Sequence, residues 1–224
     1  YRPRGSCWGA RGAFLLEGMA EVGPELAKRG IAYVARRQPP VETALLYAAE
    51  AALVVCDRNY QKPVRRFYAD FAERSSCRVV QVEGEVVVPV ETASPKHEIA
   101  ARTLRPKLRR LLPEYLVPLR EEPVTHRADH LSYESTLDLS DVPRLVGTLK
   151  ADQSVRPVRR FRGGATQAEA TLNHYLDARF RNYATVRGRP EAAAASHMSP
   201  YLHYGQISPV AIALKVLAAA TGGE

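Results

Sequence analysis

Short, uninterrupted apolar runs alternate with longer stretches of helical periodicity in the first half of the chain. The runs predict strands at residues 31–35, 52–56 and 78–82, with a further short apolar segment at 86–90. The stretches between them predict helices from Phe14 to about Arg29, from Val41 to about Ala51 and from Lys62 to about Arg74. Pro24 should kink or divide the first helix. The run at 52–56 is continuous, which is typical of a strand buried on both faces.

Strands that alternate with helices of about ten or more residues indicate β-α-β units. The predicted fold class is therefore α/β, with a Rossmann-like parallel sheet that has helices on both faces. The pattern begins with a helix, whereas a Rossmann-like half opens with a strand that lies centrally in the sheet. We therefore expect this sheet to lack a central strand.

The second half of the chain is predicted to be helical around a polar connector. Residues 97–112 form a basic helical stretch that Pro106 should bend or end, and most of its charges are expected to be a solvated face. Residues 121–160 are a connector in which Asp141 and its neighbours start a short helix to about Leu149. A long helix is predicted from Thr166 to about Thr185, after the pair Gly163-Gly164.

Residues 194–209 form the stretch that carries the candidate chemistry. Ser199 is expected to cap a short helix that has Pro200 in its first turn and ends at Gly205, and Ser208 is expected to cap the next helix, Val210 to Ala220. A helix start offers free backbone N–H groups and a positive dipole end, which suit a phosphate. On spacing alone, a helix start that binds nothing is the favoured interpretation, because most Ser-Pro helix starts have no ligand.

Composition narrows the class of protein. The chain is 46% hydrophobic and 25% charged, so a packed core is expected, and its net charge of +8 favours an anionic partner such as nucleic acid.

The three cysteines, Cys7, Cys56 and Cys77, are odd in number and widely spaced. This pattern indicates no zinc site and a reducing, intracellular compartment, and Cys56 and Cys77 are expected to be buried. His126 and His130 are expected to be exposed loop residues, because no third ligand accompanies them. We expect no membrane span and no signal peptide.

The sequence of residues 194–209, which we call the corner, also resembles that of a known protein family. Residues 195–202, Ala-Ser-His-Met-Ser-Pro-Tyr-Leu, resemble the flavin-binding signature Thr-Ser-x-Leu-Ser-Pro-Tyr-Leu of DNA photolyases and cryptochromes. The continuation His-Tyr-Gly-Gln-Ile-Ser-Pro at 203–209 is most similar to the class II cyclobutane pyrimidine dimer photolyases. Ala195 and Met198 depart from the signature, where Thr and Leu are usual. Segments 13–18, 57–60, 86–94 and 100–107 also resemble this family.

The resemblance implies light-dependent repair of pyrimidine dimers in DNA, with electron transfer from reduced FAD. It implies a photolyase-type α/β antenna domain at 1–120, a connector at 121–160 and the first helices of an all-α FAD-binding domain at 161–224. The implied FAD contacts are Tyr183, Ala195, Ser196, His197, Met198 and Ser199. The resemblance also implies an antenna chromophore of deazaflavin or folate type. It implies a monomeric protein that is cytoplasmic and associated with DNA. For Tyr183, a half-buried core aromatic fits the residues equally well.

The family's central strand and later flavin-cavity helices have no counterpart in this sequence. We therefore expect that this chain alone neither holds FAD tightly nor repairs DNA. Three other functions stay open: a cryptochrome-like flavin photoreceptor, a truncated remnant without activity, and a Rossmann-like nucleotide-binding domain joined to a helical tail. The last predicts a glycine-rich first turn, which is not visible before the first helix.

Overall fold

The computed structural model describes residues 8–128, 130–149, 154 and 156–222. The chain forms two compact units, and their segments alternate along the sequence. Unit 1 contains Arg36–Pro118, and unit 2 contains the described residues up to Ala35 together with those from Leu119 onward.

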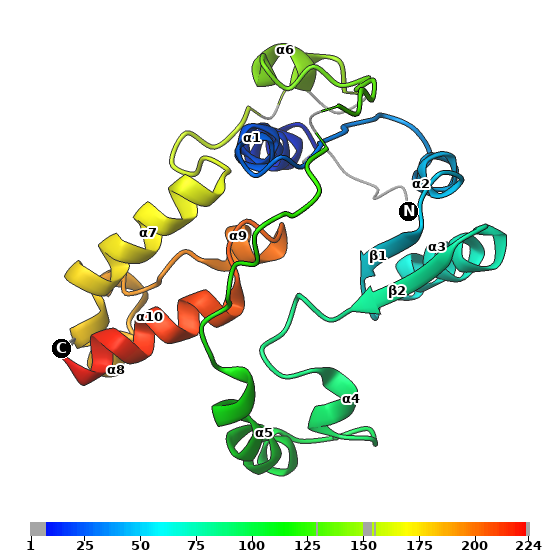
Figure 1. The fold of residues 1–224 in the computed structure, drawn as a ribbon. Coiled ribbons are helices and arrows are strands. Elements are labelled where there is room, and N and C mark those ends of the chain that lie inside the picture. Colours follow the sequence, from blue (N-terminus) through cyan, green and yellow to red (C-terminus); the bar gives the residue numbers. More distant parts are fainter. Residues whose placement is uncertain (1–7, 129, 150–153, 155, 223–224) are drawn as a thin grey trace. The chain divides into compact units, whose positions relative to one another are not determined.

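The regular elements follow one another along the chain as drawn in Figure 1. Unit 1 contains α2 (Pro40–Ala48), β1 (Leu53–Asp57), α3 (Lys62–Arg74), β2 (Arg78–Val82), α4 (Val90–Ala93) and α5 (Ala101–Tyr115). Unit 2 contains α1 (Trp8–Lys28), α6 (Val142–Gly147), α7 (Ala165–Ala178), α8 (Tyr183–Val186), α9 (Ser199–His203) and α10 (Pro209–Thr221), with 3-10 turns at Phe180–Asn182 and Pro190–Ala192.

Unit 1 is built on a parallel pair of strands, which confirms the α/β class. β1 and β2 pair in register from Leu53 opposite Arg78 to Asp57 opposite Val82. Helices α2 and α3 pack together, and Val41, Ala48 and Phe71 form a small buried cluster with them. Val54 and Val79, which lie opposite each other in the sheet, pack against this cluster. Both helices therefore cover the same face of the sheet.

The opposite face of the sheet is open within unit 1. Leu53, Val55 and Val82 are 48%, 59% and 50% exposed, and exposure alternates along β1. The prediction that β1 is buried on both faces is therefore wrong. Successive side chains of β1 point to opposite faces, and α2 and α3 pack on only one of these faces.

Helix α5 joins unit 1 mainly through polar contacts. The Lys107 ammonium donates to Glu98 Oε1 at 2.5 Å and to Ser94 Oγ at 2.9 Å. The helix continues through Pro106 and Pro113, so the expected end at Pro106 is not observed. None of its side chains is buried.

Unit 2 is organised around α1 and α7. Phe14 of α1 packs with Ala168, Leu172 and Tyr175 of α7 and with Tyr201 of α9 in one buried cluster. A second cluster joins Ala13 and Leu16 to Val146 of α6. Helix α1 runs through Pro24 without the expected division.

The pair Gly163-Gly164 lets the start of α7 approach α1 closely. A Cβ at Gly163 would overlap the carbonyl oxygen of Phe14, and one at Gly164 would overlap the Glu21 carboxylate. Gly164 also has a φ of 119°, which is unfavourable for residues with a side chain. Gly163 is therefore required by the close approach of the helices, and Gly164 by its backbone conformation.

Two predicted elements of unit 2 differ in the structure. Residues 31–35 form no strand: the Ala35 carbonyl accepts hydrogen bonds from the backbone N–H groups of Thr136 and Leu137, so an irregular segment takes the place of a ladder. The helix expected to reach Thr185 ends at Ala178, because Arg179, at φ −130° and ψ −26°, leaves the helical region. Phe180 then packs its ring edge-on to Tyr175 from a 3-10 turn.

Candidate functional site

The corner at 194–209 folds as two helices joined by a tight turn, largely as predicted. Gly205 has a φ of 65° and follows α9, and the backbone N–H of Gln206 donates to the Tyr201 carbonyl at 2.9 Å. Ser208 Oγ accepts from the Val210 N–H at 3.2 Å, which confirms Ser208 as the cap of α10. The turn therefore follows from local chemistry that the sequence displays.

Ser199 does not cap α9, which corrects the prediction. It is the first residue of the helix, Met198 precedes it, and no side chain caps this helix start. Met198 is buried in the same cluster as Tyr201 and already has near-helical dihedral angles, φ −77° and ψ −17°. Core packing of Met198 thus moves the helix start by one residue.

The buried side of the corner fixes its position in unit 2. Tyr201 is 2% exposed, and its ring lies 5.1 Å from that of Phe14, centroid to centroid. Gln206 bridges the same contact, because its amide nitrogen donates to the Phe14 carbonyl at 3.1 Å and its amide oxygen accepts from Gly164 N at 2.8 Å. The corner is therefore held on a rigid support.

A cavity of about 320 Å³ lies on the other side of the corner, and we call it the cationic pocket. Its polar lining includes Arg160, His174, Arg179, Ser196 and His197, and Tyr175 and Phe161 supply aromatic walls. No Asp or Glu is among the described residues that line it. Two permanent positive charges, imidazole groups and a hydroxyl can bind an anion.

His197, which lines this pocket, is held in an unusual conformation. Its φ is 58°, in the left-handed region, and Ala193 nearby has a φ of 47°. Its Nε2 lies 3.0 Å from Arg160 Nη2, and its ring centroid is 5.5 Å from that of Phe161. Burial lowers the pKa of His197, and the charges of Arg160 and Arg179 lower it further. The imidazole is therefore neutral near pH 7 and can accept the hydrogen bond that Arg160 donates.

The other predicted contact residues lie at different distances from the cationic pocket. The Ala195 carbonyl accepts from Arg179 Nη1 at 3.5 Å, and the Ala195 side chain is exposed. Tyr183 is 39% exposed and does not line the pocket, but its ring packs edge-on to Tyr175, 6.3 Å between centroids. The Met198 side chain lies in the core, so only its backbone is available to a ligand.

Ser199 lines a second cavity, of about 550 Å³, together with Phe14, Phe161, His203 and Tyr204. The structure thus brings Ser196 and His197 together and places Ser199 in a different hollow. Arg160, His174 and Arg179 were not singled out as site residues from the sequence. Arg160 lies in the connector, His174 lies in α7 and Arg179 directly follows α7, so only the fold brings them to the corner.

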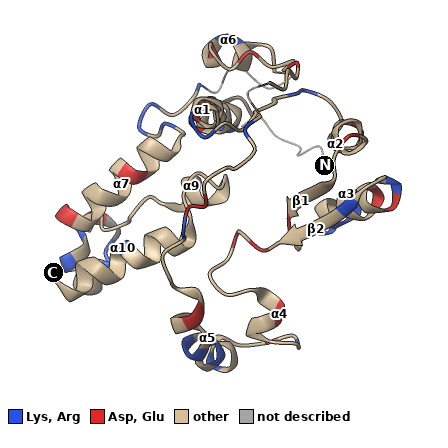
Figure 2. Ribbon diagram, in the orientation of Figure 1, with Lys and Arg blue, Asp and Glu red and all other residues tan. Residues whose placement is uncertain are grey.

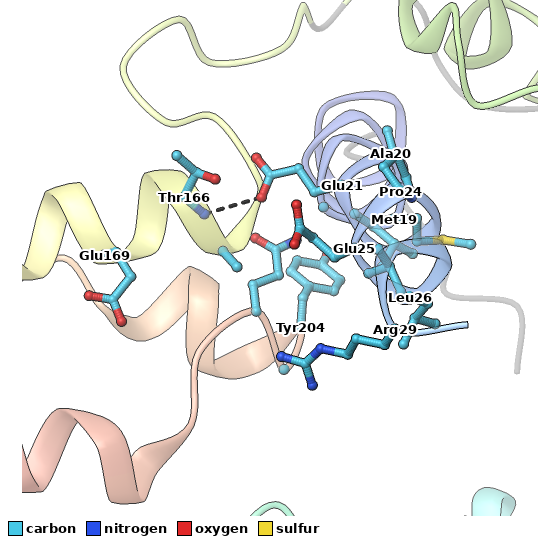
Figure 3. Close-up of a pocket in the computed structure, with 16 residues that line it drawn as sticks. Met19, Ala20, Glu21, Pro24, Glu25, Leu26, Arg29, Thr166, Glu169 and Tyr204 are labelled. Atoms are coloured by element: carbon cyan, nitrogen blue, oxygen red, sulfur yellow. Dashed lines mark hydrogen bonds between the residues drawn. The ribbon is translucent and has the colours of Figure 1, made fainter. Parts of the chain in front are cut away.

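A larger cavity of about 830 Å³ lies between α1 and the start of α7 (Figure 3). Here Glu21 Oε2 accepts from the Thr166 N–H at 3.1 Å, and Glu17 Oε2 accepts from the Gly163 N–H at 2.6 Å. Carboxylates of α1 therefore already accept hydrogen bonds from two backbone N–H groups at the start of α7. This helix start is structural and is not open to a phosphate.

The remaining candidate chemistry is limited. Among the described residues, no group of three His, Cys, Asp or Glu side chains is arranged to hold a metal ion. His126 and His130 are exposed, as predicted. Cys56 and Cys77 are only half-buried, which corrects the prediction of buried thiols, and Cys7 lies outside the described residues. Within the described ranges, no helix has the length and apolarity needed to cross a bilayer.

Comparison with known proteins agrees with this fold. A relative from Methanothermobacter thermautotrophicus, named deoxyribodipyrimidine photo-lyase, is 37% identical over 202 residues, which cover 90% of this chain and 44% of the relative. A protein of the same name from Arabidopsis thaliana is 28% identical over 219 residues and is covered to 42%. The chain thus spans less than half the length of these relatives.

The crystal structure of a bacterial class III photolyase from Agrobacterium tumefaciens matches with a TM-score of 0.68. The match covers 100% of this chain and 47% of that protein at 18% identity, so the likeness concerns the fold. The model of the DNA photolyase family matches residues 3–125, more than half of the sequence. The chain therefore belongs to the DNA photolyase family.

Proposed function

We propose that this chain is the part of a deoxyribodipyrimidine photo-lyase that begins the FAD site, and that it acts in light-dependent repair of pyrimidine dimers in DNA. The observation that carries the proposal is the cationic pocket beside the corner, where Arg160 and Arg179 face a hydroxyl and two imidazoles without an acidic residue in the described lining. This donor set fits the diphosphate of a dinucleotide cofactor. The family and the names of its relatives support FAD as that cofactor.

The residues of the corner then have distinct roles. Arg160 and Arg179 would supply the counter-charge for the diphosphate, and Ser196 would donate a hydrogen bond from its hydroxyl. His197 would position Arg160, since the two groups already share a hydrogen bond. Ala195 and Met198 would contribute through the backbone. Tyr183 and Ser199 are proposed contacts at the edge of the site.

A reduced flavin, when bound, supplies the photochemistry: light-driven donation of an electron to a pyrimidine dimer and its return after the ring has split. The described residues bind and orient the cofactor, and the rigid support of Tyr201 and Leu172 keeps the corner in place. Damaged DNA is the proposed substrate. We also propose the sequence-based division into an α/β domain, a connector and the start of a helical flavin domain. An antenna chromophore, a monomeric state and weak FAD binding by this chain alone stay predictions.

The first test measures FAD binding by the purified chain. Flavin fluorescence is recorded while FAD is titrated with the protein. Arg160→Gln and Arg179→Gln should each weaken binding by about tenfold or more, because a hydrogen bond to a charged group contributes roughly 1.5–3 kcal/mol. Arg162→Gln makes the same charge change next to the site without lining the pocket, and it should bind as the wild type does.

ADP, which also carries a diphosphate, should compete with FAD. The cationic pocket would not be the diphosphate site if all three variants lost FAD affinity equally, or if ADP did not compete with FAD. Repair is then tested by illuminating dimer-containing oligothymidylate with the chain and reduced FAD. Flavin binding without repair would favour a photoreceptor or a partial enzyme over a complete one.

A further inference from the structure

Helix α5 exposes a row of arginines that the flavin site does not use. Arg102, Arg105, Arg109 and Arg110 are all exposed, and none has an acidic partner among the described residues. The stretch from Ile99 to Pro113 contains no Asp or Glu. Figure 2 shows the resulting concentration of positive charge on this helix.

The helical spacing arranges three of these arginines on one face. Arg102, Arg105 and Arg109 follow at i, i+3 and i+7, so their Cα atoms rise by about 4.5 Å and then about 6 Å along the axis. We call these three residues the arginine face. Guanidinium groups at this spacing can each engage a different phosphate, with two parallel hydrogen bonds per phosphate.

The other side of α5 shows which way the helix is oriented. Leu104, Leu108 and Leu111 are half-buried, and Lys107 is held by Glu98 and Ser94. The leucines therefore lie on the less exposed side of the helix, and the arginines lie on its exposed side. Two other arginines of the same unit are paired: Arg58 with Glu91, and Arg74 with Glu42 and Asp70.

We propose that the arginine face of α5 binds the phosphate backbone of duplex DNA, independently of sequence and of damage. The inference rests on the proposed function, since DNA is taken as the partner, but it requires neither flavin nor a lesion. An anionic membrane is the less favoured partner, because a membrane-bound helix needs its apolar side free and these leucines are already half-buried. Backbone contacts of this kind add affinity and on-rate without reading bases.

The experiment measures binding of the chain to a labelled, undamaged duplex of about 20 base pairs, in the dark and without flavin, at increasing salt. The triple variant Arg102→Gln, Arg105→Gln, Arg109→Gln should lower the slope of log K against log salt by about 0.9 for each lost phosphate contact, hence by about 2.7. A matched triple variant on α3, Lys62→Gln, Arg65→Gln, Arg66→Gln, changes the same charge in the same unit and should keep the wild-type slope.

Circular dichroism checks that both triple variants fold, and replacement of the three arginines of α5 by Lys should restore most of the salt dependence. If the α5 and α3 triple variants lowered the salt slope equally, overall charge and not the arginine face would explain binding, and the proposal would be overturned. An α5 triple variant with the wild-type slope would also overturn it. Binding of the arginine face to phosphatidylserine vesicles but not to duplex would assign a membrane partner instead. If the chain binds duplex but shows no FAD binding at all, not even the weak binding predicted for it, the proposed flavin site is rejected and this inference stands.

Discussion

The corner of unit 2 and the sheet of unit 1 have similarly apolar sequences but opposite degrees of enclosure. Leu172 behind the corner is 0% exposed, whereas Val55 in β1 is 59% exposed. Around the corner, α1, α7 and α9 contribute to one cluster, whereas the described helices of unit 1 cover a single face of the sheet. An apolar run therefore indicates that a segment can be buried, and the neighbouring elements decide whether it is.

The comparison also separates two ways of holding a segment in place. The corner depends on close backbone approach and aromatic packing, at Gly163 and Tyr201. The outer part of unit 1, around α5, depends on a polar contact between Lys107 and Glu98. Substitutions in the first region should consequently affect stability much more than those in the second.

The largest effect is expected from Gly163→Ala. The new Cβ would overlap the Phe14 carbonyl oxygen, so α7 must move away from α1 and the core that supports the corner must open. We expect the free energy of unfolding to fall by roughly 3 kcal/mol or more, measured by urea denaturation and circular dichroism. Gly188→Ala is the control, because nothing lies within 4 Å of its added Cβ. A Gly163→Ala protein as stable as the control would show that the helices do not approach so closely.

A pair of leucine truncations measures the difference in enclosure directly. Leu172→Ala should lower the free energy of unfolding by about 3 kcal/mol, because it leaves a cavity in a filled core. Leu53→Ala removes the same atoms from the open face of the sheet, where the side chain is 48% exposed, and should cost less than about 1 kcal/mol. Urea denaturation gives both values. Similar losses at the two positions would mean that the open face is covered in solution.

The smallest effect concerns the polar contact of α5. The hydrogen bond from Lys107, with those from Thr103 and Ser94, lowers the pKa of Glu98 to about 2. Because the folded-state pKa lies below the unfolded value, this contribution is present above about pH 4.5 and is lost as the pH falls toward 2. The stability difference between wild type and Glu98→Gln should therefore shrink steadily over that range, measured by urea denaturation at several pH values.

Glu114→Gln removes a carboxylate at the end of the same helix and is the control for this titration. Glu114 has no acid–base partner among the described residues, so its variant should not show the convergence at low pH. A constant difference for Glu98→Gln across the range would show that Lys107 does not hold this carboxylate in solution.

Much of the fold could be read from periodicity and capping residues. The bounds of α3 and β2 agree with the predictions, and Gly205 and Ser208 act at the corner as expected, because these signals are local. The prediction of a strand at 31–35 was wrong. A strand needs a neighbouring strand to complete its hydrogen-bond ladder, and this segment forms hydrogen bonds with an irregular segment instead. The exposed face of β1 was missed because side-chain alternation does not say which faces will be covered.

For the candidate site, the sequence by itself determined the corner and its resemblance to a flavin-binding signature, since both depend on residues adjacent in the chain. Only the tertiary structure brought Arg160 and Arg179 to Ser196 and His197, moved the start of α9 to Ser199, and placed Met198 in the core. The physical reason is that charge clusters and core contacts join residues far apart in sequence. The packing of α1, α7 and α9 sets those distances, and no local pattern records them.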